Sequence, residues 1–201
     1  MMRELVYYVA VSIDGFIAEP DGTFDAFPVT GDHAAVLTSD FADAVPTQFL
    51  EMLGVAPPRS RFDTVIQGSR SYRIALDEGN EHPYAHLREY VATRSGATPP
   101  DGVTYTADPL ATIRDLKQED GLGIYLCGGG VLAGSLLSEI DQLVLKRYPI
   151  VLGDGIRMFA GADPTVAPFN LVSTRRFESG LVIEEYRRPD EGSPFRGPSR
   201  A

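Results

Sequence analysis

The segment IYLCGGGVLAGSLLSEI, residues 124–140, joins a short apolar run, three consecutive glycines and a stretch with helically spaced apolar residues. This order predicts a buried strand, a tight turn and a helix. Glycine has no Cβ, so three in a row indicate that another group comes very close to the main chain. The first N–H groups of a helix have no partner inside it and, with the helix dipole, favour an anion. The segment therefore predicts a site for a phosphorylated ligand.

Two other interpretations of this turn bear on its meaning. Gly128, Gly130 and Ala133 match the dinucleotide pattern G-x-G-x-x-A, which is weak without its structural context. The same residues are also explained by a tight turn without a ligand, in which the small residues Ala133, Gly134 and Ser135 pack against a sheet. An ordinary Rossmann arrangement fits poorly, because its glycines follow the first strand and here they come late in the chain.

Composition sets the class of protein. The chain has 201 residues, 43% hydrophobic and 23% charged, as expected for a globular protein with a substantial core. A net charge of -10 argues against general affinity for nucleic acid or anionic membranes, which needs clustered Lys and Arg. The single Cys127 excludes an internal disulfide. No apolar run is long enough to cross a membrane and no targeting stretch precedes the first strand, so we expect a cytoplasmic protein without a membrane partner.

Hydrophobic patterns predict an α/β fold in which strands alternate with helices and a final antiparallel hairpin closes the sheet. We expect residues 1–188 to form a single domain, with residues 19–32 as a packed loop that suits a lid. The tail, residues 189–201, has little to bury and is expected to be disordered. The predicted strands cover residues 5–11, 63–66, 87–93, 103–106, 124–127, 142–152, 171–177 and 181–186. The predicted helices cover residues 41–53 and 69–76, begin at Asp108-Pro109 and stop at Gly121, and follow the glycine turn.

Several motifs in order resemble the dihydrofolate reductase superfamily. They are SIDGFIA after the first strand, VIQGSRSY, a strand ending in TRS, LCGGGVLAGSLL and the C-terminal hairpin. The nearest likeness is to small bacterial proteins similar to the reductase domain of the bifunctional riboflavin-biosynthesis deaminase/reductase, and it covers residues 4–188. The resemblance implies a dihydrofolate-reductase-like three-layer fold, with a mixed, mostly parallel central sheet flanked by helices.

The resemblance also implies NADPH lying across the sheet edge, and a cis peptide in the first glycine pair. The nicotinamide pocket would be lined by Ala10, Ile17 and Ala18. The phosphates would meet Gly68, Ser69, Arg70 and Ser71, and the adenosine 2′-phosphate would face Thr93, Arg94 and Ser95. The pyrophosphate and the nicotinamide side would be held by Gly128, Gly129, Gly130, Val131 and Leu132, and we count the preceding Cys127 among the cofactor-binding residues. A bidentate arginine suits the ribose phosphate, which makes Arg94 and Arg70 the candidates for NADPH preference.

The chain departs from the family pattern in three places. The usual Gly-Arg pair is Gly68-Ser69 here, with the arginine one place later at Arg70. Cys127 stands where the riboflavin reductases commonly carry a Glu that helps bind the aminopyrimidine. A carboxylate of the kind that folate enzymes use cannot be assigned by spacing, and we expect its candidates to be solvated: Asp40, Asp43 and Glu51. Asp14 is our candidate for the catalytic acid, with a turn-stabilising role before Gly15 as the alternative.

We therefore expect an NADPH-dependent oxidoreductase acting on a small pyrimidine- or pterin-type molecule. Its activity would resemble that of 5-amino-6-(5-phosphoribosylamino)uracil reductase or dihydrofolate reductase. A non-catalytic NADPH-binding or sensing protein on the same scaffold is the alternative. We expect no metal, since His82 and His86 have Pro83 between them and no third ligand nearby. A homodimer is expected, with residues 142–152 and the hairpin as the candidate surface.

Overall fold

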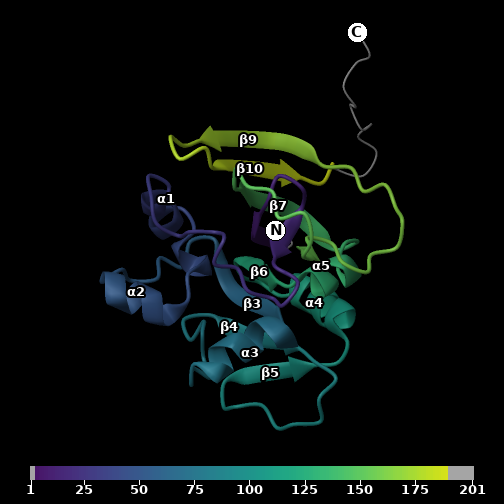
Figure 1. Cartoon of the computed structure of the whole chain (residues 1–201). Helices are drawn as coiled ribbons and strands as arrows, with labels where there is room; N and C mark the ends of the chain where they lie inside the picture. Colours follow the sequence, from purple (N-terminus) through teal and green to yellow (C-terminus); the bar gives the residue numbers. More distant parts are fainter. Residues whose placement is uncertain (1–2, 190–201) are drawn as a thin grey trace.

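An eight-stranded sheet runs through the centre of the protein, whose computed structural model describes residues 3–189 (Figure 1). The strands follow the spatial order β5-β4-β3-β6-β1-β7-β10-β9. Neighbours from β5 to β7 are parallel, and β10 pairs antiparallel with both β7 and β9. Their bounds are β1 Leu5–Val11, β3 Phe62–Gly68, β4 Arg88–Ala92, β5 Val103–Thr106, β6 Gly123–Gly128, β7 Ile140–Arg147, β9 Asn170–Arg176 and β10 Val182–Arg187. The predicted mixed, mostly parallel sheet with its C-terminal hairpin is confirmed.

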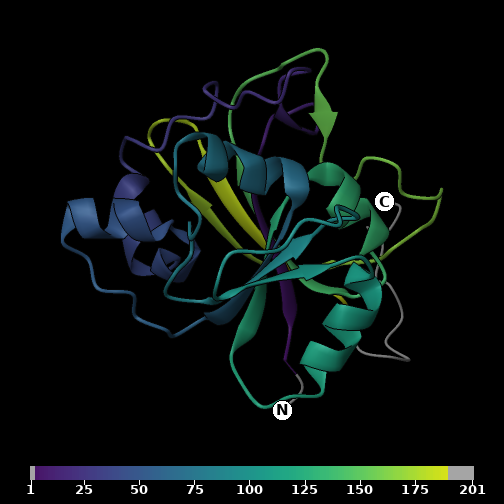
Figure 2. The ribbon, with the colours of Figure 1, turned by 90° about the horizontal axis from the view of Figure 1, so that it is seen from below.

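Helices cover both faces of this sheet and complete three layers (Figure 2). On one face α4 (Pro109–Lys117) and α5 (Gly130–Ser135) bury Ile113 and Leu132 in a core that includes Tyr7 of β1. The opposite face is covered by α1 (Ala34–Ser39), the 3-10 helix η1 (Ala42–Ala44) and α2 (Thr47–Leu53). There Leu37 packs in a second core with Tyr8. α3 (Ser69–Asp77) buries Tyr72 against Val91 and Val103.

The segment before β3 differs from the single helix expected over residues 41–53. Pro46 lies at the N-cap of α2, outside the helix, and the preceding residues form α1 and η1 instead. A residue before proline is pushed towards extended backbone, and Val45 has ψ 132°. A helix therefore cannot run through this point. Gly54 ends α2 in the left-handed conformation, which glycine adopts without strain.

Two further elements stop earlier than predicted. α4 ends at Lys117 before Gly121, and β7 ends at Arg147 although apolar residues continue to 152. Those residues leave the sheet to support the SIDGFIA segment, where Ile13 N donates to Ile150 O at 2.8 Å. Next to this contact, β8 (Ile156–Arg157) pairs antiparallel with β2 (Phe16–Ala18). This small second sheet fixes the chain just beyond the carboxyl end of β1.

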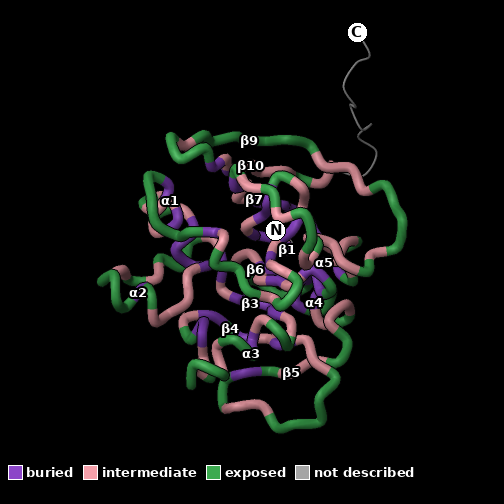
Figure 3. Tube along the Cα trace, viewed as in Figure 1, coloured by how far each residue is buried: buried purple, intermediate pink, exposed green. Residues whose placement is uncertain are grey.

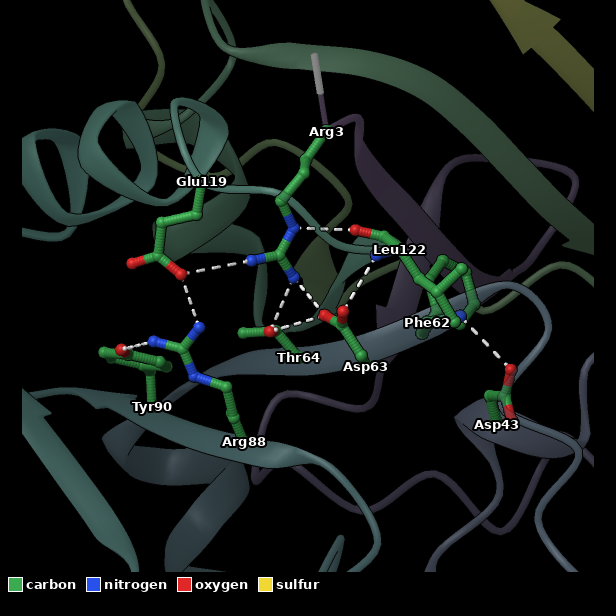
Figure 4. A network of polar contacts seen from close by, with 9 residues as sticks. All are labelled: Arg3, Asp43, Phe62, Asp63, Thr64, Arg88, Tyr90, Glu119 and Leu122. Atoms are coloured by element: carbon green, nitrogen blue, oxygen red, sulfur yellow. Dashed lines mark hydrogen bonds and ion pairs between the residues drawn. The ribbon is translucent and has the colours of Figure 1, made fainter. Parts of the chain in front are cut away.

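A polar network closes the opposite, amino edge of the sheet (Figure 4). The buried Arg3 guanidinium donates to Leu122 O and to Thr64 Oγ1, both at 2.7 Å, and pairs with Asp63. The Asp63 carboxylate also accepts from Leu122 N at 2.8 Å. Gly121 has no room for a Cβ, which would lie 2.6 Å from Asp63 Oδ2. The loop between α4 and β6 is thereby tied to β3.

Burial follows the layers: the central strands are largely buried, whereas β9 is exposed along its length (Figure 3). The tail for which we predicted disorder lies outside the described residues, apart from its first residue, Pro189. Within residues 3–189, none of the helices has the length and apolarity needed to cross a membrane.

Candidate functional site

The carboxyl ends of four adjacent strands bring the predicted cofactor-binding residues to one edge of the sheet. In spatial order these strands are β4, β3, β6 and β1. β4 leads into residues 93–95, β3 into residues 68–71, β6 into residues 128–132, and β1 contains Ala10 and leads into residues 14–18. Neighbouring strands lie about 4.8 Å apart, so the four ends span about 14 Å, enough for an extended ligand. Open α/β sheets bind their ligands at this edge.

The two strand–glycine–helix junctions touch each other. A Cβ at Gly68, the N-cap of α3, would lie 3.4 Å from Gly128 O and 3.5 Å from Gly129 N. The peptide between Gly128 and Gly129 is cis, as the family resemblance implies. A Cβ at Gly128 would meet nothing within 4 Å, and one at Gly129 would meet only Ser71 Oγ, at 3.9 Å. The main chain of this turn therefore faces open space.

The third glycine has a different neighbour. A Cβ at Gly130 would collide with the carbonyl oxygen of Arg157, and Ala160 N donates to Gly130 O at 3.1 Å. Gly134 is equally confined, because its Cβ would lie 2.5 Å from Ala160 O. At these two positions the closely approaching group is the protein's own backbone. The small-residue interpretation of the turn is thus correct for this part, although the partner is the end of β8 with the loop after it, and not the central sheet.

The remaining residues of α5 divide between core and surface. Leu132 is 7% exposed and packs in the core with Tyr7, whereas the Val131 side chain is 67% exposed. Ile17 packs against the same core, and Ala18 is buried in β2, where it pairs with Ile156. Apart from Val131, these apolar side chains are therefore packed within the protein beside the turn.

The polar residues at the β3 and β4 ends are open to solvent. Ser69, Arg70, Arg94 and Ser95 are exposed, while Ser71 and Thr93 are half-buried. The Thr93 and Ser95 hydroxyls order the loop by accepting from Ser95 N and Ala97 N, both at 3.1 Å. Within residues 3–189, neither arginine forms an ion pair, and both guanidinium groups can reach an added anion.

Asp14 anchors a loop. Its carboxylate accepts from Ser12 Oγ at 2.6 Å, Gly153 N at 2.8 Å and Leu152 N at 3.2 Å. The hydrogen bonds from Ser12 and from the two amides hold the pKa of the Asp14 carboxyl below its ordinary value. A carboxylate kept ionised by three donors is poorly suited to donating a proton. The geometry favours the turn-stabilising alternative left open at the sequence level.

A group of titratable side chains that the motifs did not identify lies on the sheet face beside this edge. Tyr84 Oη and Cys127 Sγ are 3.4 Å apart, and burial raises the pKa of the Cys127 thiol. On β7, Lys146 Nζ lies 4.2 Å from the centroid of the Tyr8 ring. Burial lowers the pKa of Lys146 to about 8. The local sequence does not mark this group, since Lys146 stands next to a second cation, Arg147, in the run LVLKRYPIVL.

Sequence comparison assigns the chain to a protein family. The RibD C-terminal domain family matches residues 3–183. The chain belongs to the RibD C-terminal domain family. It is also similar to YwjB of Bacillus subtilis (strain 168), an uncharacterized protein. The two are 34% identical over 166 residues, which cover 79% of this chain and 84% of YwjB.

Solved structures of other proteins share the fold of this RibD C-terminal domain. The diaminohydroxyphosphoribosylaminopyrimidine deaminase/5-amino-6-(5-phosphoribosylamino)uracil reductase of Thermotoga maritima is similar with a TM-score of 0.64 and 18% identity, covering 94% of this chain and 57% of that one. Dihydrofolate reductase from Enterococcus faecalis has a TM-score of 0.59 and 15% identity, covering 94% of this chain and all of that one. The dihydrofolate-reductase-like fold is confirmed, and a reductase-type function is supported.

The three acidic residues weighed as folate-type carboxylates have separate places in this RibD C-terminal domain. Asp40 pairs with Arg175 at 2.9 Å, and Glu51 is exposed on α2. Asp43 is 1% exposed and accepts from the backbone of the loop before β3. The expectation that Asp43 is solvated is wrong, because its carboxylate has buried amide partners.

Proposed function

We propose that the chain is an NADPH-dependent reductase that delivers a hydride to a small pyrimidine- or pterin-type heterocycle. The observation that carries this proposal is the alignment of the β4, β3, β6 and β1 ends along one edge, with Gly68 directly against the Gly128-Gly129 peptide. Such an edge offers backbone amides to phosphates and a floor of small residues to a flat ring.

The residues present fit NADPH. The turn at Gly128 and Gly129 leaves an open cradle that a side chain would narrow. Arg70 and Arg94 are exposed guanidinium groups on the neighbouring strand ends, where they would hold phosphate oxygens. Ala10 and Ile17 would border the nicotinamide. When bound, the reduced nicotinamide supplies the hydride.

The comparisons support the substrate class. The Thermotoga maritima protein is a 5-amino-6-(5-phosphoribosylamino)uracil reductase by name, and the Enterococcus faecalis dihydrofolate reductase was solved with NADP(H). We extend the nicotinamide cofactor and the nitrogen-heterocycle substrate from these proteins to this chain as a proposal.

The loop over residues 19–32 would shield the substrate from water. Its buried Phe27 packs edge-on against Tyr148, with ring centroids 5.3 Å apart, and Tyr148 Oη donates to Pro28 O at 2.7 Å. Tyr148 follows β7 two residues after Lys146. The loop is thus fastened beside the substrate face, where it can exclude water and position a ring.

Titration with NADPH and NADH, followed by nicotinamide fluorescence, tests the cofactor. Wild-type protein is expected to bind NADPH more tightly than NADH. Arg94→Ala is expected to lose about 1–3 kcal/mol of NADPH binding and little NADH binding, because a charge-assisted contact to the 2′-phosphate is lost. Absence of binding to either nucleotide contradicts the proposal. NADPH binding without oxidation in the presence of 5-amino-6-(5-phosphoribosylamino)uracil, dihydrofolate or dihydropterin supports the sensing alternative instead.

A further inference from the structure

Lys146 is an unusual residue in this chain. The sequence contains only two lysines, Lys117 and Lys146. Lys117 is buried at the amino edge, where its ammonium donates to Glu139 O at 2.6 Å and pairs with Asp141 at 2.8 Å. Lys146 is half-buried at the other end of the sheet, and within residues 3–189 no carboxylate contributes to its pKa. Its amine is therefore not committed to a structural ion pair.

Strand register places this amine beside the proposed nicotinamide pocket. Lys146 of β7 is the direct neighbour of Ala10 on β1. Side chains alternate along a strand, so Lys146 shares the face of Val144, which packs in the same core as Tyr8. Cys127 of β6 borders this core too and acts electrostatically on Lys146. The amine and the cofactor edge therefore lie on adjacent strands.

The groups that surround Lys146 do not hold its ammonium in an ion pair, so the ammonium can give its proton to a substrate. Tyr8 presents its ring face to Nζ, and that ring stacks on Phe41 with centroids 4.7 Å apart. On the other side of β7, the neighbour of Lys146 is the apolar Ile183 of β10. Burial disfavours the charged amine more than the Tyr8 ring face favours it, which is why the pKa of Lys146 falls to about 8. An ammonium with that pKa is still protonated at neutral pH and gives up its proton readily. The titratable groups next to it are Tyr8 and Cys127. The groups behind these two are Tyr148 and Arg61, which act on Tyr8, and Tyr84 and Tyr125, which contact Cys127.

A second polar group lies on the same face near the end of β3. Gln67 is 2% exposed, and its Nε2 has no hydrogen-bond partner among the described residues. Gln67 is the register neighbour of Gly128, next to Cys127. A buried amide without a partner costs free energy unless a ligand satisfies it. Together with Lys146, it makes this part of the face rich in donors.

We propose that Lys146 donates the proton that completes the reduction, and that the substrate presents a carbonyl oxygen or imine nitrogen to it. This assignment rests on the proposed function. The substrate carbon receives a hydride from reduced nicotinamide, and the π electron pair of its C=O or C=N bond moves to the heteroatom. That heteroatom takes a proton from Lys146 Nζ, which leaves a neutral amine and oxidised nicotinamide. The amine then regains a proton from water.

The same geometry narrows the substrate class. An aminopyrimidine edge presents N–H donors and is best held by a carboxylate. Here the position before the glycine turn is Cys127, the Asp14 carboxylate is occupied by loop donors, and Lys146 and Gln67 are themselves donors. A ring that turns oxo or imine acceptors towards β7 and β3 fits this arrangement.

Lysine labelling provides a test that needs no turnover. Trace acetylation with acetic anhydride across a pH series, read by peptide mass spectrometry, reports each lysine separately. The Lys146 labelling rate is expected to rise with a midpoint near 8. Lys117 is the internal control and is expected to react poorly because it is buried. A Lys146 midpoint near the ordinary value of 10.5 overturns the proposal.

Variants then separate proton donation from binding. With whichever of the three named substrates the wild type reduces, Lys146→Ala is expected to lower kcat by about 10²–10⁴-fold, the usual share of general acid catalysis. NADPH affinity should stay within about threefold, and added methylamine should partly restore kcat. Lys146→Arg should retain the charge but not kcat, because guanidinium does not give up its proton. Arg147→Met, at the next position on β7, is the matched control.

The outcomes distinguish this inference from the proposed function. Wild-type kcat is expected to fall as the pH rises above about 8, and this alkaline limb should be absent in Lys146→Ala. If wild type binds and oxidises NADPH but Lys146→Ala keeps both its kcat and its alkaline limb, Lys146 is not the donor while the reductase function stands. If wild type neither binds nor oxidises NADPH, both proposals fail together.

Discussion

Asp43 fixes the entry to β3. Its two carboxylate oxygens accept from the backbone of Arg59 at 2.7 Å, Ser60 at 2.9 Å, Arg61 at 2.8 Å and Phe62 at 3.1 Å. A carboxylate can accept from several donors, whereas an asparagine amide replaces one acceptor with a donor. The residue is buried on η1, so water cannot take over these contacts.

Asp43→Asn is therefore expected to lower the free energy of unfolding by about 3 kcal/mol, since hydrogen bonds to a buried charge are lost and donors are left unpaired. Urea denaturation followed by circular dichroism measures it. Asp40→Asn is the control, because the Asp40 pair with Arg175 is largely solvent-exposed and should contribute less than about 1 kcal/mol. Equal losses in the two variants would contradict a special role for Asp43.

Lys146 links pH to stability in a direction that can be worked out. Its pKa is about 8 in the folded chain and 10.5 ordinarily, so between these values the unfolded chain binds more protons. Stability then rises with pH across that window. Below pH 8 both states are charged, and the folded state bears the full cost of the buried ammonium. The residue proposed as proton donor is thus expected to destabilise the protein at neutral pH.

Lys146→Met should raise the free energy of unfolding at pH 7 by about 1 kcal/mol, or roughly 2–4 °C in Tm for a chain of this size. The gain should shrink as the pH approaches 10.5, where the wild-type cost is relieved. Thermal unfolding at a series of pH values measures both. A gain that stays constant with pH would show that shape, and not charge, accounts for the effect.

At the scale of elements, two adjacent glycines of the turn lack a side chain for different reasons. A Cβ added at Gly129 would face open space, with only Ser71 Oγ nearby at 3.9 Å, whereas a Cβ at Gly130 would collide with Arg157 O. Neither has a positive φ, so side-chain volume is what distinguishes them. The missing side chain at Gly129 leaves the main chain open to a ligand. The missing side chain at Gly130 lets α5 pack against the end of β8 and the loop after it.

Gly129→Ala should weaken NADPH binding by about tenfold or more while costing less than about 1 kcal/mol of stability, because its Cβ points at the proposed ligand. Gly130→Ala should cost about 2–3 kcal/mol, because backbone must move. Paired measurements of NADPH titration and urea unfolding check this. Similar losses of stability in both variants would contradict the division of roles.

The elements that could be predicted are those whose signal is local. Apolar runs such as residues 5–11 and 103–106 predicted strand bounds correctly, and Asp108-Pro109 marked the start of α4, where Asp108 accepts from Ala111 N at 3.0 Å. α1 was missed because it has six residues and buries only Leu37, too few for a periodic pattern. β7 was predicted too long, because Ile150 and Leu152 are apolar for packing against the core that includes Tyr8, beyond the end of the strand.

The part of the candidate site that consists of sequence motifs could be predicted. The ordered glycine and TRS motifs lie at the ends of β4, β3, β6 and β1, which meet at one edge because parallel strands end together. That these residues bind a cofactor stays a prediction. Lys146 and Gln67 were missed because nothing in their local sequence marks them. Their environment depends on residues far along the chain, such as Tyr8 for Lys146 and Gly128 for Gln67. Asp14 matched a motif, yet its partners at 152 and 153 were not visible in one dimension.

At the scale of the whole molecule, one edge of the sheet is left unusually open. We expected a dimer surface on residues 142–152 and the hairpin; β7 is paired on both sides, with β1 and β10, so the free edge within that surface belongs to the hairpin. Of the two edge strands, β5 and β9, it is β9 that is exposed throughout, with Leu171 and Val172 each 57% exposed (Figure 3). A long, unpaired edge strand with apolar side chains invites a partner strand.

We expect a homodimer formed through β9, because a strand pairing about a twofold axis presents the same surface to its copy and satisfies both free edges. Size-exclusion chromatography with light scattering should give twice the chain mass of 21.8 kDa.

Val172→Lys should shift the protein from the dimer towards the monomer mass of 21.8 kDa. It should not lower the Tm by more than about 2 °C, since the Val172 side chain is exposed within one copy. Met52→Lys is the control: that residue is 80% exposed on α2, away from β9, so the variant should remain a dimer. A wild-type chain that elutes as a monomer at high concentration would contradict the predicted dimer, because β9 would then be exposed to solvent in the protein as it exists in solution.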